Sequence, residues 1–111
     1  MSVIKQSELP WSVIAHEFVG EDHGGIGFTF LLVDAEPGQG PALHRHPYPE
    51  VLIVQEGEAT AAVGAETLVV RAGDIVVIPA NVVHGFVNTG AGRLRQVDIH
   101  ASPHFVTEWL K

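Results

Sequence analysis

The chain has 111 residues, of which 46% are hydrophobic, with no cysteine and a formal net charge of −7. This length suits a single domain over residues 1–111 that can bury a core without disulfide bonds. The negative charge argues against nucleic acid and anionic membranes as partners, because both bind basic surfaces. The lack of cysteine excludes thiolate metal ligands and is compatible with a cytoplasmic protein. We also expect no signal peptide and no membrane-spanning segment, because no apolar run approaches the roughly 20 residues that a bilayer requires.

Short apolar segments between glycine- and proline-rich turns predict a chain built almost entirely of β-strands. The expected strands cover residues 13–19, 26–34, 50–55, 58–63, 66–70, 75–78, 82–87 and 94–100. Two of them form a hairpin around a turn at residues 64–65. Near the end of the chain, Ser102 and Pro103 are typical of the start of a helix. Phe105 and Trp109 follow at helical spacing, so we expect a short C-terminal helix.

His44, His46 and Glu50 fall within seven residues of one another in a region of strand and turn. The two histidines are two positions apart, so their side chains point to the same face of an extended chain. Glu50 has the same parity. Two imidazoles and a carboxylate on one face are typical ligands of a divalent transition metal, and His84 is a fourth candidate further along the chain.

Both stretches around these residues resemble motifs of the cupin family. The first motif, G-x5-H-x-H-x3-E-x6-G, is matched at every fixed position by Gly38, His44, His46, Glu50 and Gly57. The second motif, G-x5-P-x-G-x2-H-x3-N, is matched by Gly73, Pro79, His84 and Asn88. Asn81 stands where the second motif has glycine. Asparagine tolerates the left-handed backbone conformation, so we expect the turn to be kept.

The resemblance implies an all-β, double-stranded β-helix (jelly-roll) barrel with the candidate ligands pointing inward. It implies one divalent transition metal per chain, with Fe, Mn, Ni, Cu, Co and Zn all compatible with the ligand set His44, His46, Glu50 and His84. A metal that keeps open positions for water or substrate belongs to a catalytic site rather than a structural one. The alternative is that these are polar residues on the rim of a barrel that match the motifs by coincidence.

Parity also predicts which residues surround the metal. We expect the pocket to be lined by Phe28, Phe30, Tyr48, Leu52, Val54 and Phe86, which would suit a modest organic ligand or an aromatic ring. Gln96, Asp98 and His100 form a polar stripe on the last strand that either adds to the pocket or faces solvent, and the sequence slightly favours solvent. Surface positions are expected for His23 and His104, while His16 has no ligand spacing.

Two functions remain open at this stage. The first is a metal-dependent enzyme, most plausibly an oxygenase, in which Glu50 acts as a catalytic base; the cupin resemblance also allows isomerases, decarboxylases and lyases. The second is a non-catalytic module that binds a small ligand. The sequence shows no second domain through which a bound ligand would signal, and this favours the enzyme. A metal-free structural dimer is a third reading that the complete ligand set disfavours.

The strand over residues 50–55 is apolar on both faces. Leu52 and Val54 share the parity of Glu50, so Val51 and Ile53 are expected to point outward. An outward apolar face predicts a covering layer or subunit. We therefore expect a homodimer.

Overall fold

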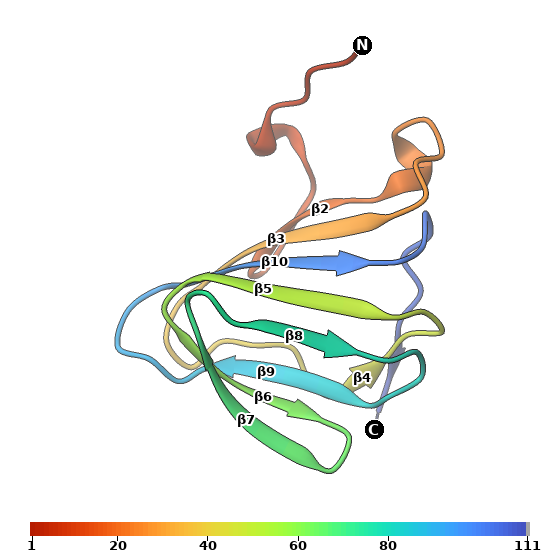
Figure 1. Cartoon of the computed structure of the whole chain (residues 1–111). Coiled ribbons are helices and arrows are strands. Elements are labelled where there is room, and N and C mark those ends of the chain that lie inside the picture. The colour runs from red at the N-terminus through yellow and green to blue at the C-terminus, as the bar shows by residue number, and fades with distance from the viewer. Residues whose placement is uncertain (111) are drawn as a thin grey trace.

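Two antiparallel β-sheets face each other across the interior of the molecule in the computed structural model, which describes residues 1–110 (Figure 1). The first sheet has the order β1 (Trp11–Ser12), β2 (Ala15–Phe18), β3 (Thr29–Ala35), β10 (Leu94–His100), β5 (Glu50–Glu56), β8 (Ile75–Ile78). The second has the order β11 (Glu108–Trp109), β4 (His44–Arg45), β9 (His84–Asn88), β6 (Glu58–Val63), β7 (Glu66–Arg71). Two short 3₁₀ turns, η1 (Gln6–Glu8) and η2 (Gly20–Asp22), complete the elements.

The chain repeatedly crosses from one sheet to the other, which is how a jelly roll closes its interior. β4 lies in the second sheet, β5 in the first, the β6–β7 hairpin in the second, and then β8, β9 and β10 alternate. The all-β jelly-roll prediction is therefore confirmed. The predicted hairpin is also present, with β6 and β7 paired from Glu58 opposite Arg71 to Val63 opposite Glu66.

Two predicted elements differ from the structure. The expected strand over residues 13–19 is shorter in the structure, where β2 covers Ala15–Phe18 and a tight turn centred on Val13, whose φ is +56°, separates it from β1. The expected C-terminal helix is wrong, because residues 101–104 form bends and β11 pairs with β4 instead. The backbone groups of Val106 bond to the Tyr48 hydroxyl and the His46 ring rather than to a following helical turn. A short segment forms an isolated helix poorly, so these outside partners decide its conformation.

The apolar core fills the end of the interior where β5 turns into β6. Leu52, Val54 and Leu94 are buried there, together with Ala59 and Ala61 from the facing sheet, and Ile78, which pairs with Glu50, extends the core toward the other end. The inward parity predicted for Leu52 and Val54 is confirmed. Full burial of each large aliphatic side chain stabilises the fold by about 1.5–3 kcal/mol. At the β5–β6 turn Gly57 has a φ of +86°, and a Cβ there would lie 2.3 Å from the Arg93 carbonyl oxygen, so glycine is required.

The described residues include no helix of the length and apolar character that a bilayer-spanning segment needs. The opposite end of the interior, where β5 begins and β10 ends, holds polar side chains instead of apolar ones. That end carries the candidate site.

Candidate metal centre

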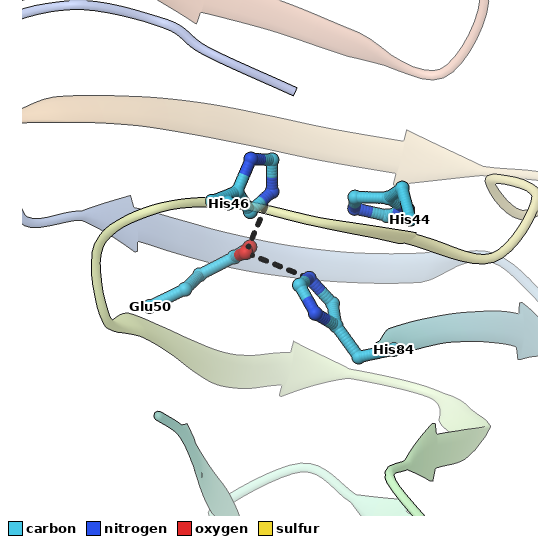
Figure 2. Close-up of side chains that lie close together, drawn as sticks. All are labelled: His44, His46, Glu50 and His84. Carbon is cyan, nitrogen blue, oxygen red and sulfur yellow. Dashed lines mark hydrogen bonds and ion pairs between the residues drawn. The ribbon is translucent and has the colours of Figure 1, made fainter. Parts of the chain in front are cut away.

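Four side chains from both sheets meet at the polar end of the interior (Figure 2). They are contributed by β4 (His44), the turn after it (His46), the first residue of β5 (Glu50) and the first residue of β9 (His84). One potential ligand atom from each lies within 4.8 Å of those of the others. All four side chains are buried.

The local sequence explains how this group assembles. His44 pairs directly with His84 across β4 and β9, which brings the two imidazole rings to 4.4 Å between centroids. The turn Pro47–Pro49 carries the chain from the second sheet to the first, so Glu50 approaches from the opposite side. Asn81 adopts the left-handed conformation, with a φ of +65°, and its N–H donates to the His46 carbonyl oxygen at 2.7 Å. The prediction that asparagine would keep this turn is confirmed.

Backbone carbonyls fix the orientation of all three imidazoles. The Nδ1 atoms lie 2.7 Å from the Ala42 oxygen for His44, 2.8 Å from the Val106 oxygen for His46 and 2.8 Å from the Val82 oxygen for His84. A carbonyl oxygen only accepts a hydrogen bond, so each Nδ1 carries the proton. Each Nε2 therefore presents a lone pair in the neutral ring. This is the outer arrangement that orients histidine ligands around a metal.

Glu50 lies between these Nε2 atoms. Its Oε1 is 3.0 Å from the Nε2 of His84 and 3.2 Å from that of His46. Burial favours the neutral carboxyl group, but the facing imidazoles of His100, His46 and His84 together hold the pKa of Glu50 well below its usual range. The carboxylate is therefore ionised.

The histidines respond to this charge in different ways. Burial, aided by the neighbouring His84 and His46 rings, lowers the pKa of His44, although its bond to the Ala42 carbonyl opposes this. For His84, burial acts in the same direction, but the contact with Glu50 and the Val82 carbonyl outweigh it and raise the pKa. The site thus holds one ring neutral and places another beside a negative charge.

This donor set fits a divalent metal. The Nε2 atoms of His84 and His46 lie 3.0 Å and 3.2 Å from the same Glu50 oxygen, so either a proton on a ring or a metal ion relieves the repulsion between their lone pairs. The Nε2 of His46 is buried and makes no hydrogen bond among the described residues. Neutral imidazoles and one carboxylate are the ligands preferred by divalent transition metals. The cluster therefore fits one such ion per chain.

Two further side chains support the cluster from behind. The Nε2 of His100 lies 3.2 Å from the second carboxylate oxygen of Glu50. The Tyr48 hydroxyl lies 2.8 Å from the Nδ1 of His100 and 3.3 Å from the Nδ1 of His46. Burial raises the pKa of Tyr48 to about 12, so its hydroxyl keeps its proton and donates to His100. Tyr48 is buried and joins two parts of the site.

The polar stripe on β10 points into the interior. Gln96, Asp98 and His100 are all buried, and His100 pairs with Glu50 across β10 and β5. The slight preference for a solvent-facing stripe is therefore wrong. Val97 and Ile99 give this strand an apolar opposite face, so its sequence alone favoured the wrong orientation.

A cavity of about 360 Å³ opens beside the candidate ligands. Its wall is mostly apolar, with Leu31 and Val33 from β3, Phe86 from β9, and Phe105 and Trp109 from the C-terminal segment. All four candidate ligands, together with Asp98 and His100, reach this cavity. The candidate ligands thus lie in the wall of a space large enough for a small organic molecule.

The structure places the six predicted pocket residues in four different environments, and Tyr48 is the one that lies behind the candidate ligands. Phe86 lines the cavity, whereas Leu52 and Val54 lie in the apolar core. Phe28 and Phe30 do not line it, because the inward residues of β3 are Leu31 and Val33. They form an aromatic cluster with Phe18, whose ring stacks on Phe30 at 4.5 Å, and Phe28 is 43% exposed. Both faces of this stretch are apolar, so parity alone could not select the inner one.

The remaining histidines lie away from the cluster. His16 packs against Trp11, and His23 stacks on Phe18. His104 is exposed and contacts the Glu21 carboxylate at 2.9 Å. The surface position predicted for His104 is confirmed. His23 is partly buried by its stacking contact.

Comparisons with known proteins agree with this architecture. A family model described as a cupin domain matches residues 31–100. A curated relative, polyketide synthase CurC from Streptomyces cyaneus, is 34% identical over 86 residues, which are 77% of this chain and 53% of the relative. The chain thus spans about half the length of that relative.

Solved structures share the fold. A structure of oxalate oxidase superposes with a TM-score of 0.70 and 26% identity, covering 78% of this chain and 47% of the other. Oxalate decarboxylase from Bacillus subtilis, a protein with Mn(II) centres, superposes with a TM-score of 0.83 and 24% identity, covering 94% of this chain and 30% of the other. The second likeness is evidence for the fold alone.

Proposed function

The chain belongs to the cupin family, and from this premise we propose that it is a metal-dependent enzyme acting on a small organic substrate, most plausibly as an oxygenase. The observation that carries the proposal is the buried group of three histidines and one glutamate in the wall of an apolar cavity. A structural metal site is closed, whereas this group borders a space that can hold a substrate.

We propose His44, His46, Glu50 and His84 as the metal ligands. A bound metal would supply open coordination positions and, for iron, manganese, nickel, cobalt or copper, redox chemistry with O2. The ligand set does not select among these metals.

The protein's own residues have separate tasks in this proposal. Carbonyls on three loops hold the imidazoles in the required tautomer. Leu31, Val33 and Phe86 give the cavity an apolar wall that orients a substrate and limits access of water. Glu50 is the candidate proton acceptor, because its carboxylate is ionised and reaches the cavity.

Elemental analysis of reconstituted protein, followed by O2 consumption, tests this function. We expect one equivalent of metal per chain, which His46→Ala and His84→Ala lose and the exposed control His104→Ala keeps. The substrate panel contains aromatic and 1,3-diketone compounds, including polyketide-like ones suggested by the relative CurC. O2 consumption with one of these compounds, lost in His46→Ala, supports the oxygenase. Absence of metal after reconstitution would overturn the central claim.

A non-catalytic ligand-binding cupin is the second candidate. It is favoured by the same cavity, whose wall is mostly apolar. Saturable binding of panel compounds without turnover at any metal would select this function and count against the enzyme.

We further propose that the chain forms a homodimer through the outer face of the first sheet. As predicted, Val51 and Ile53 lie on that face, since their neighbours in β5 point inward. The edge strand β8 adds Ile75 and Val77, which are 63% and 67% exposed. A second copy would cover these side chains. We expect dimer mass in solution and monomer mass for Val77→Lys.

The cytoplasm remains the compartment we expect, on the absence of cysteine alone.

A further inference from the structure

A carboxyl group that the metal cluster does not use lies in the cavity wall. Asp98 is only 2% exposed, and it is one of the residues that line the cavity. Its partner along β10, Gln96, is equally buried and donates from Nε2 to the Asp98 Oδ1 at 2.7 Å. The fold alone does not explain this pair, since apolar residues at two inward positions of a sheet would be better accommodated.

The pair has unused hydrogen-bonding capacity. Gln96 satisfies one carboxyl oxygen of Asp98, which leaves Oδ2 for a molecule in the cavity. The Oε1 of Gln96 is also buried without a hydrogen-bond partner among the described residues, but Gln96 does not line this cavity. The free carboxyl oxygen of Asp98 is therefore the polar group of this pair that a ligand in the cavity can reach.

The charge of the cavity selects the kind of ligand. No arginine or lysine is among the described residues that line it, whereas Glu17 and Asp98 are. Burial, with a further contribution from the negative charge of Glu50, raises the pKa of Asp98 well above its ordinary value. A neutral Asp98 donates a hydrogen bond through its carboxyl O–H and therefore suits a carbonyl oxygen.

We propose that Asp98, positioned by Gln96, is an anchoring residue that binds the carbonyl oxygen of a neutral, largely apolar ligand in the cavity beside the metal cluster. This deepens the proposed function and rests on it only for the statement that the anchored compound is the substrate. It also separates this chain from the oxalate enzymes that share its fold. A small dianion would meet acidic groups and no cationic side chain, and it would fill little of a cavity of about 360 Å³.

Three probes of similar shape test the anchor. Acetophenone carries a neutral carbonyl, ethylbenzene lacks the carbonyl, and benzoate replaces it with a charged carboxylate. Binding is measured by NMR titration of the full chain, using amide shifts and the indole N–H of Trp109, which lines the cavity. Titrations are run on metal-free and Zn²⁺-loaded protein, because the metal-free measurement reports the anchor without any contribution from the metal.

In the metal-free protein we expect acetophenone to bind about tenfold more tightly than ethylbenzene, the ratio that one hydrogen bond of roughly 1.4 kcal/mol gives. Benzoate should bind more weakly than either. Asp98→Leu, which keeps the branched shape of the side chain and removes the hydrogen-bonding group, should abolish the preference for acetophenone. Asp98→Asn should retain most of it, because an amide N–H also donates to a carbonyl oxygen.

Several outcomes would overturn the proposal. Equal affinities for acetophenone and ethylbenzene in the wild type would do so, and this comparison needs no variant to fold. A preference that persists in Asp98→Leu, or benzoate binding more tightly than acetophenone in the metal-free chain, would also reject it. Loss of metal binding or of O2 consumption leaves these metal-free ratios unchanged, so failure of the proposed enzyme and failure of the anchor are separate results.

Discussion

The same strands run through both ends of the barrel interior, but they bury apolar side chains at one end and polar side chains at the other. At one end β5 contributes Leu52 and Val54 to an apolar core, and β10 contributes Leu94. At the other end the same two strands contribute Glu50 and His100, which face each other at 3.2 Å. The comparison shows that one end supplies the burial that stabilises the fold, while the other accepts buried polar groups that only a ligand or a metal can fully satisfy.

The largest effect on stability is expected from the apolar end. Leu52→Ala removes a side chain packed between the two sheets and leaves a cavity. We expect the free energy of unfolding to fall by about 2–5 kcal/mol, and the Tm of the metal-free protein by on the order of 10 °C or more. Thermal unfolding followed by circular dichroism measures this change.

The matched control is Leu68→Ala on β7, where the leucine is exposed. It should lower the free energy of unfolding by less than about 1 kcal/mol. Metal stoichiometry, measured below the Tm, should stay unchanged in both variants. If Leu52→Ala loses metal while still folded, the two ends of the interior are not independent and the comparison fails.

At the polar end, Tyr48→Phe is expected to weaken metal binding and to lower the free energy of unfolding by about 1–3 kcal/mol, because the Val106 N–H and the His100 Nδ1 lose the hydroxyl to which they bond. The hydroxyl that is removed contacts the rings of His100 and His46, one facing Glu50 and the other a candidate ligand. Losing such outer support typically lowers metal affinity by about 10–100-fold. Competition with a chelator gives the affinity, and unfolding of the metal-free variant gives the stability. Unchanged affinity would show that Tyr48 only fills space.

The sequence predicted the parts of this comparison that depend on strand parity and fixed spacing. The common face of His44, His46 and Glu50 follows from the two-residue period, and His84 could be added through the cupin motif. Parity failed for Phe28 and Phe30, because a strand that is apolar on both sides does not show which side is inner. The C-terminal helix failed because its backbone groups bond to Tyr48 and His46, contacts that no local pattern reveals.

His100 was the residue of the site that sequence reasoning undervalued. It belongs to neither motif, and a polar stripe on a strand normally faces water. Only the pairing of β10 with β5 places it opposite Glu50. Asp98 was likewise expected to face solvent, and both residues are polar side chains buried in the barrel interior.

The pH dependence of stability sharpens this point through Asp98. The pKa of Asp98 is raised in the folded protein above the ordinary value of 3.8. Its contribution to the free energy of unfolding is therefore fully present below that pH and is lost as the pH rises, because the unfolded chain releases this proton more readily than the folded one. Asp98→Asn cannot ionise. The metal-free variant should therefore gain stability relative to the wild type between pH 4 and pH 7, by on the order of 1 kcal/mol or more. Denaturant unfolding of both proteins at the two pH values measures the difference. A constant difference would mean that Asp98 is ionised at little cost in the folded state.

The smallest expected effect comes from the turn between β1 and β2, where the backbone is strained. Val13 lines the cavity with a φ of +56°, a conformation that a β-branched residue adopts at a cost of about 1 kcal/mol or more. Its side chain is 78% exposed, so Val13→Gly removes little packing. We expect this variant to raise the free energy of unfolding by about 1 kcal/mol, measured by denaturant titration. The matched change Asn81→Gly, at a φ of +65°, should alter the free energy of unfolding by only about 0.3 kcal/mol, because asparagine tolerates this region. A loss of stability in Val13→Gly would mean that the packing of the valine side chain stabilises the fold by more than its backbone strain costs.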